Sequence, residues 1–110
     1  MTTPLKPVDF LILLSLVDQE RHGYGLLQDI SELTDGEVTL DAGNLYRSLR
    51  RLLDDGFLEK SERRPAPESD DERRRYYRLT SAGRKVARGE AQRMDGLLRA
   101  GAAKKLLSES

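Results

Sequence analysis

The segment from Asp41 to Leu79 constrains the fold most, because it has the pattern of a capped helix followed by two strands. On a helix, its leucines form one apolar stripe and leave the side chains of Asn44, Arg47 and Arg51 on the opposite face. The stripe consists of Leu45, Leu49, Leu52 and Leu53. Asp41 is a favourable N-cap, and Gly56 is placed to close the helix. This helix is expected to pack its leucines on a core and to expose a basic face.

Two strand candidates follow this helix, at residues 57–62 and 73–79. The loop between them contains prolines and a cluster of acidic residues, which is typical of an exposed hairpin tip. In the second strand, side chains alternate between the two faces, with Tyr77 and Leu79 on one and Tyr76 and Arg78 on the other. One tyrosine is therefore expected to pack inward and the other to face solvent or a ligand.

Two helices are predicted before this unit, at about 7–19 and about 24–34, and His22-Gly-Tyr-Gly25 forms the turn between them. The first helix is apolar on two sides. One stripe, of Phe10, Leu13, Leu14 and Val17, is expected to pack on its own domain. The other, of Val8, Ile12 and Leu16, is expected to pack on a partner subunit.

A last helix is predicted from Ser81 to about Leu107, with Thr80 as its cap. Ala91, Met94 and Leu98 lie at the spacing of a helix-pairing seam, and we expect them to form the dimer interface with the first helix. The fold class is therefore mainly α with a small β-hairpin. A winged helix-turn-helix is assigned to residues 1–80, and a C-terminal dimerisation helix to residues 81–110.

Composition excludes several classes of function. The chain of 110 residues contains no cysteine and one histidine, so disulfides, thiolate metal sites and histidine clusters are excluded. We expect no metal, no cofactor and no catalytic residues, and therefore no enzyme. The longest apolar run, Phe10 to Val17, is too short to span a bilayer and lacks a cleavage pattern behind it, which favours a cytoplasmic protein without membrane association.

The formal net charge of zero hides a gradient along the chain. Residues 1–41 carry 2 basic and 8 acidic side chains, whereas residues 79–110 carry 7 basic and 3 acidic ones. Attraction to phosphate depends on a local basic face rather than on total charge, because salt screens it beyond roughly 8 Å. The balance of charge is therefore compatible with DNA as a partner.

The basic face of the helix that begins at Asp41 is the candidate site for double-stranded DNA. Asn44 can bond adenine and Arg47 can bond guanine, each through two hydrogen bonds, while Arg50 and Arg51 are expected to reach phosphates. Tyr46, at the edge of the leucine stripe, fits core packing and a phosphate contact equally well. The second strand adds further phosphate contacts at Arg73, Arg74 and Arg75.

Several motifs in one order resemble the PadR family of transcriptional regulators. They are His22-Gly-Tyr-Gly25, Leu45-Tyr46, Leu52-Leu-Asp-Asp-Gly-Phe-Leu58 and Arg73-Arg-Arg-Tyr-Tyr-Arg-Leu-Thr-Ser-Ala-Gly83. The resemblance covers roughly residues 5–100. It implies a homodimer that binds an inverted-repeat operator and usually represses. In some members of the family a small-molecule effector releases the DNA.

A second reading of the same residues remains open. The charged hairpin could dock on a protein, which would make the chain a winged-helix interaction module without DNA binding. A steep loss of binding with added salt, with a slope near 0.9 for each neutralised phosphate, would favour DNA.

Overall fold

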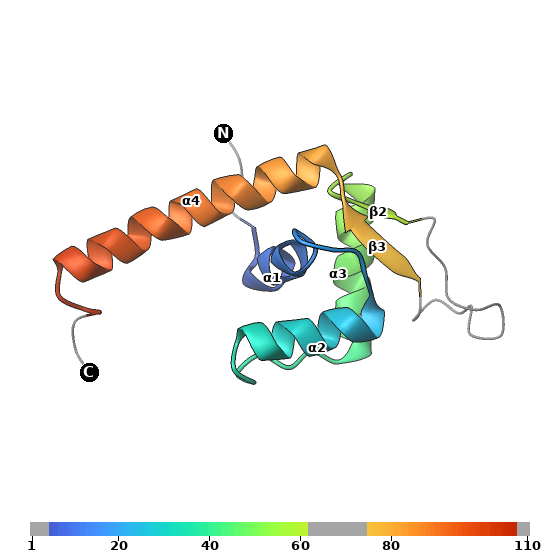
Figure 1. Cartoon of the computed structure of the whole chain (residues 1–110), viewed down its shortest axis with the longest axis horizontal. Helices are drawn as coiled ribbons and strands as arrows, with labels where there is room; N and C mark the ends of the chain where they lie inside the picture. Colours follow the sequence, from blue (N-terminus) through green and yellow to red (C-terminus); the bar gives the residue numbers. More distant parts are fainter. Residues whose placement is uncertain (1–4, 62–74, 108–110) are drawn as a thin grey trace.

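The computed structural model describes residues 5–61 and 75–107. Its elements follow the order α1, β1, α2, α3, β2, β3 and α4 (Figure 1). The helices are α1 (Pro7–Ser15), α2 (Gly23–Leu33), α3 (Ala42–Asp54) and α4 (Ser81–Ala103). The strands are β1 (Arg21–His22), β2 (Leu58–Lys60) and β3 (Tyr76–Leu79). Within the described residues this is a mainly α fold with one small antiparallel sheet, as the sequence predicts.

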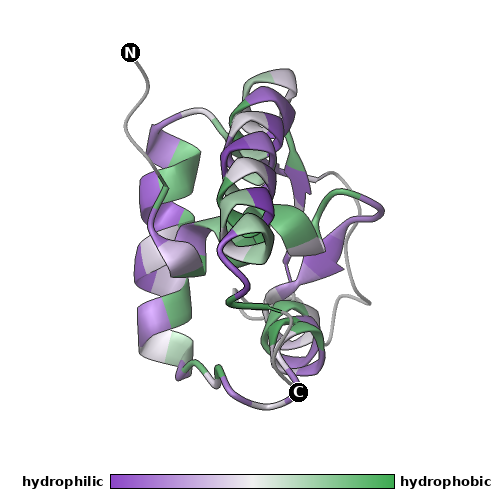
Figure 2. Cartoon of the chain, turned by 90° about the vertical axis from the view of Figure 1, so that its left-hand side faces the viewer, coloured by the Kyte–Doolittle hydropathy of each residue, from purple (hydrophilic) through white to green (hydrophobic). Residues whose placement is uncertain are grey.

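Helix α1 lies at the centre of the molecule, between α4, α2 and α3 (Figure 1). In Figure 2, hydrophobic colouring is concentrated toward this interior, and hydrophilic colouring prevails on the outer sides of the surrounding helices. Ile12, Leu13 and Leu16 of this region are almost completely buried, in one cluster with Leu26, Leu45 and Leu49 from the other helices. The core therefore forms where the apolar sides of the helices meet.

The structure does not divide the two stripes as predicted, although Leu13 of the first stripe is buried in the core of its own domain as expected. Ile12 and Leu16 belong to the protomer's own core, and Val8 packs partly buried against it. Leu14 and Val17, expected inside, are 37% and 38% exposed. Periodicity showed correctly that two sides of the helix are apolar, but three neighbouring elements cover α1, and the hydrophobic pattern does not say from which direction they approach.

The sheet has three strands in the order β1-β3-β2, rather than the two of a simple hairpin. Strand β3 pairs antiparallel with β2, Leu58 opposite Leu79, and with β1, Arg21 opposite Tyr77. Tyr77 is 2% exposed and packs in the core, whereas Tyr76 is half-buried on the other face, as the alternation predicts. Strand β1 anchors the start of α2 to the base of the hairpin.

The ends of α3 are determined by local hydrogen bonds. The Asp41 carboxylate accepts a hydrogen bond of 2.7 Å from the backbone N–H of Asn44. At the other end, the N–H groups of Gly56 and Phe57 donate to the carbonyls of Leu53 and Leu52, and Gly56 has a φ of +81° that favours glycine. These bonds confirm both predicted ends of the helix.

Helix α4 begins beside the segment that joins α3 to β2. The Thr80 hydroxyl caps α4 by accepting from Gly83 N–H and also donates to the carbonyl of Gly56 at 2.6 Å. A Cβ atom at Gly83 would lie 2.0 Å from the carbonyl oxygen of Phe57, so only glycine fits this close approach. The start of the long helix is thus tied to the base of the wing, the unit formed by β2 and β3.

Beyond its first turns, α4 extends away from the other helices, as Figure 1 shows, and the molecule measures 54 × 32 × 22 Å. The helix ends at Ala103, before the expected Leu107, because Lys105 takes a left-handed conformation with φ of 66° and Leu106 N–H bonds Gly101. No helix in the described ranges is long and apolar enough to cross a membrane.

Candidate nucleic-acid interface

The outward face of α3 begins with a chain of polar contacts. Asn44 donates from its side-chain nitrogen to Asp41 at 2.8 Å, and its side-chain oxygen accepts from the Arg47 guanidinium. Asn44, Arg47 and Arg50 are exposed. The same helix buries Leu45, Leu49 and Leu52, so the leucine stripe holds these polar groups toward solvent. This face has the hydrogen-bonding groups that base edges and phosphates require.

Arg51 differs from these side chains because it has a partner on α1, although its own side chain is 41% exposed. Its guanidinium donates to the carboxylate of Asp9 on α1 at 2.6 Å, and the Asp9 side chain is only 7% exposed. The expected phosphate contact at Arg51 therefore competes with a contact inside the protein. Tyr46 is half-buried and packs against the hydrophobic core, which agrees with one of its two readings.

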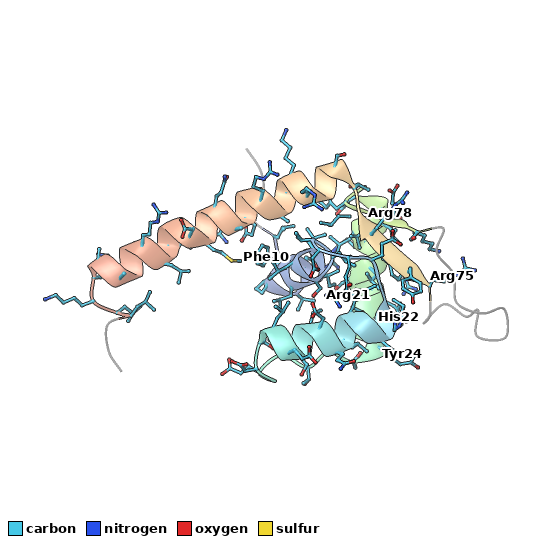
Figure 3. All side chains as sticks on the ribbon, viewed as in Figure 1. Phe10, Arg21, His22, Tyr24, Arg75 and Arg78 are labelled. Atoms are coloured by element: carbon cyan, nitrogen blue, oxygen red, sulfur yellow. The ribbon has the colours of Figure 1, made fainter. Side chains whose placement is uncertain are left out.

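The arginines of the wing are only partly within the described residues. Arg73 and Arg74 lie outside them, and Arg75 lies directly before β3. Arg78, on the outer face of β3, pairs with Glu59 of β2 at 2.7 Å across the strand pair. Arg75 thus lies at the start of β3, whereas Arg78 is occupied in holding the two strands together (Figure 3).

The N-terminus of α2 lies beside the wing. His22 caps this helix, because its Nδ1 atom accepts a hydrogen bond of 3.0 Å from Gly25 N–H. Its ring makes edge contacts with Tyr76 of β3 and with Tyr24, which is 45% exposed. In Figure 3, His22, Tyr24 and Arg75 lie at the same end of the molecule. The sequence predicts a turn residue at His22 but not its contact with Tyr76, because that contact depends on the pairing of β1 with β3, and a strand of two residues has no recognisable pattern.

Two other arginines are structural. Arg21 donates from Nε to the carbonyl of Ser15 at 2.7 Å and pairs with Asp29 of α2 at 3.6 Å. Arg84 of α4 donates to the carbonyl of Val17 at 3.1 Å. Both arginines attach the C-terminal end of α1 to neighbouring elements, so they are not counted with the candidate interface.

Glu90 is a buried carboxylate that sequence reasoning missed. It is 6% exposed on α4 and is paired with Arg93. The hydrogen bond from Arg93 holds the pKa of Glu90 below its ordinary value, and the backbone N–H of Leu5 acts in the same direction. Glu90 thereby attaches the segment before α1 to α4. A regular spacing of apolar residues could not reveal this contact, because it depends on where the N-terminal segment lies.

The expected seam of α4 is mostly solvent-exposed within one protomer. Ala91 is exposed, Met94 is half-buried and Leu98 is 56% exposed. A shallow groove lies between α1 and α4, lined by Phe10, Leu14, Val17, Ala87 and Ala91 among others. Exposed apolar side chains thus lie on both sides of this groove, although others, such as Leu33 of α2 and Leu106, lie elsewhere on the described surface. No cluster of three or more metal-ligating side chains occurs in the described part of the chain.

A helix pair α2–α3 packed on α1, followed by a β2–β3 wing, defines a winged helix-turn-helix protein. Residues 12–89 match the sequence model described as "Transcriptional regulator PadR-like family". The chain therefore belongs to the PadR-like family of transcriptional regulators.

Individual proteins are similar to this chain in sequence or in fold. A Lysinibacillus sphaericus protein described as uncharacterized protein X is 34% identical over 77 residues, which are 70% of this chain and 68% of that protein. A transcriptional regulator from Clostridium thermocellum is similar with a TM-score of 0.71 and 26% identity, over 88% of this chain and 87% of that one. Bacillus subtilis PadR in complex with operator DNA has a TM-score of 0.65 and 23% identity, over 80% of this chain but 48% of PadR.

Proposed function

We propose that this protein is a sequence-specific regulator that binds double-stranded DNA as a homodimer and acts as a repressor. The exposed polar face of α3 carries the proposal. It presents Asn44 and Arg47 for base edges and Arg50 for a phosphate, on a helix whose other side is fixed in the core. The similarity of this chain to Bacillus subtilis PadR, whose structure contains operator DNA, supports DNA as the partner.

The wing and the start of α2 complete the proposed interface. Arg75 lies where the wing begins, and Arg73 and Arg74 precede it in the sequence as further phosphate contacts. Tyr24 is exposed at the first turn of α2, where backbone N–H groups also favour a phosphate. In this arrangement α3 enters a major groove and the wing follows the flanking backbone.

The dimer is proposed from the uncovered apolar side chains. Leu97 and Leu98 of α4 are 60% and 56% exposed, and Leu14 of α1 and Val17, which follows this helix, are also exposed. A second copy would bury them if its α4 packed against the groove between α1 and α4, with Ala91 and Met94 at the contact. Two protomers related by a twofold axis would bind an inverted repeat whose half-sites lie about one helical turn apart.

A small-molecule effector would have its place in the same interface. The groove lined by Phe10, Leu14 and Ala91 is apolar and would be closed by the partner. A molecule that binds one arrangement of the two protomers better than another would change the spacing of the two α3 helices.

The experiment that tests the proposal is selection of binding sites from a random pool of DNA duplexes, followed by titration of the selected duplex at several salt concentrations. We expect an inverted repeat to be enriched, and we expect affinity to fall steeply with salt because phosphate contacts release counterions. No enrichment of any sequence, together with binding that salt leaves unchanged, would favour the alternative of a protein-interaction module.

A further inference from the structure

At the C-terminal end of the proposed reading face of α3, an ion pair joins elements far apart in sequence, with the Asp9 side chain 7% exposed and the Arg51 side chain 41% exposed. Arg51 belongs to the last turn of α3, and Asp9 to the first turn of α1. Their contact of 2.6 Å joins residues 42 positions apart. Each charge is also favoured by its own helix, because an acid stabilises an N-terminus and a base stabilises a C-terminus.

We propose that Asp9 and Arg51 are positioning residues that set the orientation of α3 on α1, and that Arg51 acts through this contact rather than as a phosphate ligand. The Asp9 carboxylate is almost fully buried, so loss of its cationic partner would leave an uncompensated charge inside the protein. This requirement holds Arg51 toward α1. The inference rests on the proposed DNA-binding function.

The ion pair lies where it could control the orientation of the base-reading side chains of α3. Asn44, Arg47 and Arg51 line one groove between α1 and α3, together with Asp9 and Lys6. A change in the angle of α3 at Arg51 would therefore move the base-reading groups at its other end. Helix α1 also carries the exposed Leu14, which is proposed for the dimer interface. The same ion pair would therefore determine how each α3 is oriented relative to the twofold axis of the dimer.

A phosphate contact and a positioning contact predict opposite results. If Arg51 binds a phosphate, Arg51→Gln should lower the salt slope by about 0.9, and Asp9→Asn should leave affinity unchanged or raise it by freeing the arginine. If the pair positions α3, both variants should bind the selected duplex more weakly, by roughly 5- to 100-fold. Their salt slopes and their affinity for unrelated duplexes should stay as in the wild type.

The experiment titrates the full chain and the variants Asp9→Asn, Arg51→Gln and Asp9→Asn/Arg51→Gln against the selected duplex, an unrelated duplex and duplexes with altered half-site spacing. Arg50→Gln is the matched control, because Arg50 lies next to Arg51 and is exposed. We expect this control to lower the salt slope. We expect the double variant to lose no more affinity than the weaker-binding single variant, because the effects of substituting two residues in contact do not add. We also expect the double variant to discriminate half-site spacing less sharply than the wild type.

Each outcome decides between the alternatives. A reduced salt slope in Arg51→Gln with undiminished binding by Asp9→Asn would overturn the inference. If a single variant does not fold, the double variant is measured instead, because it buries no net charge. Wild-type affinity and wild-type spacing preference in the double variant would also overturn the inference. Failure of the wild type to select any duplex would remove the proposed function itself. Wild-type selection that depends on Arg47 but not on Asp9 or Arg51 would remove only this inference.

Discussion

At the scale of single residues, the side chains of α3 have different tasks although they share one helix. Arg47 and Arg50 are exposed, whereas Arg51 is held by Asp9. The sequence predicts the exposed face because leucine spacing determines it. It could not assign Arg51, since the partner of this arginine comes from a helix 42 residues earlier, and nothing local identifies that partner.

Arg47 gives the most direct test of the reading face. Replacing Arg47 with alanine should weaken binding of the selected duplex by about 1 to 3 kcal/mol and relax the preference at one base position. Thermal unfolding should be unchanged, because the side chain is exposed and contacts Asn44 on its own helix. Unchanged affinity and preference in titrations would show that another face reads the DNA.

Glu90 predicts a dependence of stability on pH. Its pKa is lowered in the folded protein by Arg93, so the pair contributes stability above the ordinary carboxyl pKa, and this contribution is lost as pH falls through the folded pKa. Glu90→Gln should therefore lower the melting temperature at neutral pH, and the difference from wild type should shrink below about pH 4.5. Melting curves from pH 3 to pH 7 measure this difference, with Glu37→Gln, an exposed carboxylate between α2 and α3, as the comparison. A constant difference over this range would contradict the assignment.

At the scale of elements, local signals fixed the ends of α3 and the start of α4, and long-range pairing decided the rest. Asp41 and Thr80 cap their helices as predicted, because caps involve residues three positions apart. Strand β1 was missed because a two-residue strand has no periodicity of its own. The stripes of α1 were divided wrongly at Ile12, Leu16, Leu14 and Val17, because periodicity does not show which side its neighbours occupy.

Two glycines of α4 should respond in opposite ways to alanine. Gly83→Ala should destabilise the protein by about 1 to 3 kcal/mol, because the new methyl group would collide with the Phe57 carbonyl and push α4 from the wing. Gly89→Ala, in the same helix with open space around it, should stabilise by up to about 1 kcal/mol. Denaturant unfolding of both variants measures these changes. Equal effects would mean that helix propensity alone governs both positions.

At the scale of the whole molecule, the uncovered apolar side chains of α4 and α1 point to assembly. A charge placed among them should prevent it. Leu98→Asp should give monomers in sedimentation and should weaken operator binding strongly, because a carboxylate would have to be desolvated at the contact and one half-site offers fewer contacts. Gln92→Asp places the same charge on α4 outside the expected seam and should remain dimeric. A wild type that sediments as a monomer at micromolar concentration would contradict the dimer.

The projection of α4 beyond the other helices has a further consequence, for the rate at which its backbone amides exchange with heavy water. The C-terminal half of α4 has few neighbours, so its backbone hydrogen bonds should open readily. In an isolated protomer, the amides from Ala91 to Ala103 should therefore exchange faster than those of α1. A second copy packed along this half would suppress the opening. Protection of these amides should therefore rise with protein concentration, which would make α4 an internal reporter of the association equilibrium.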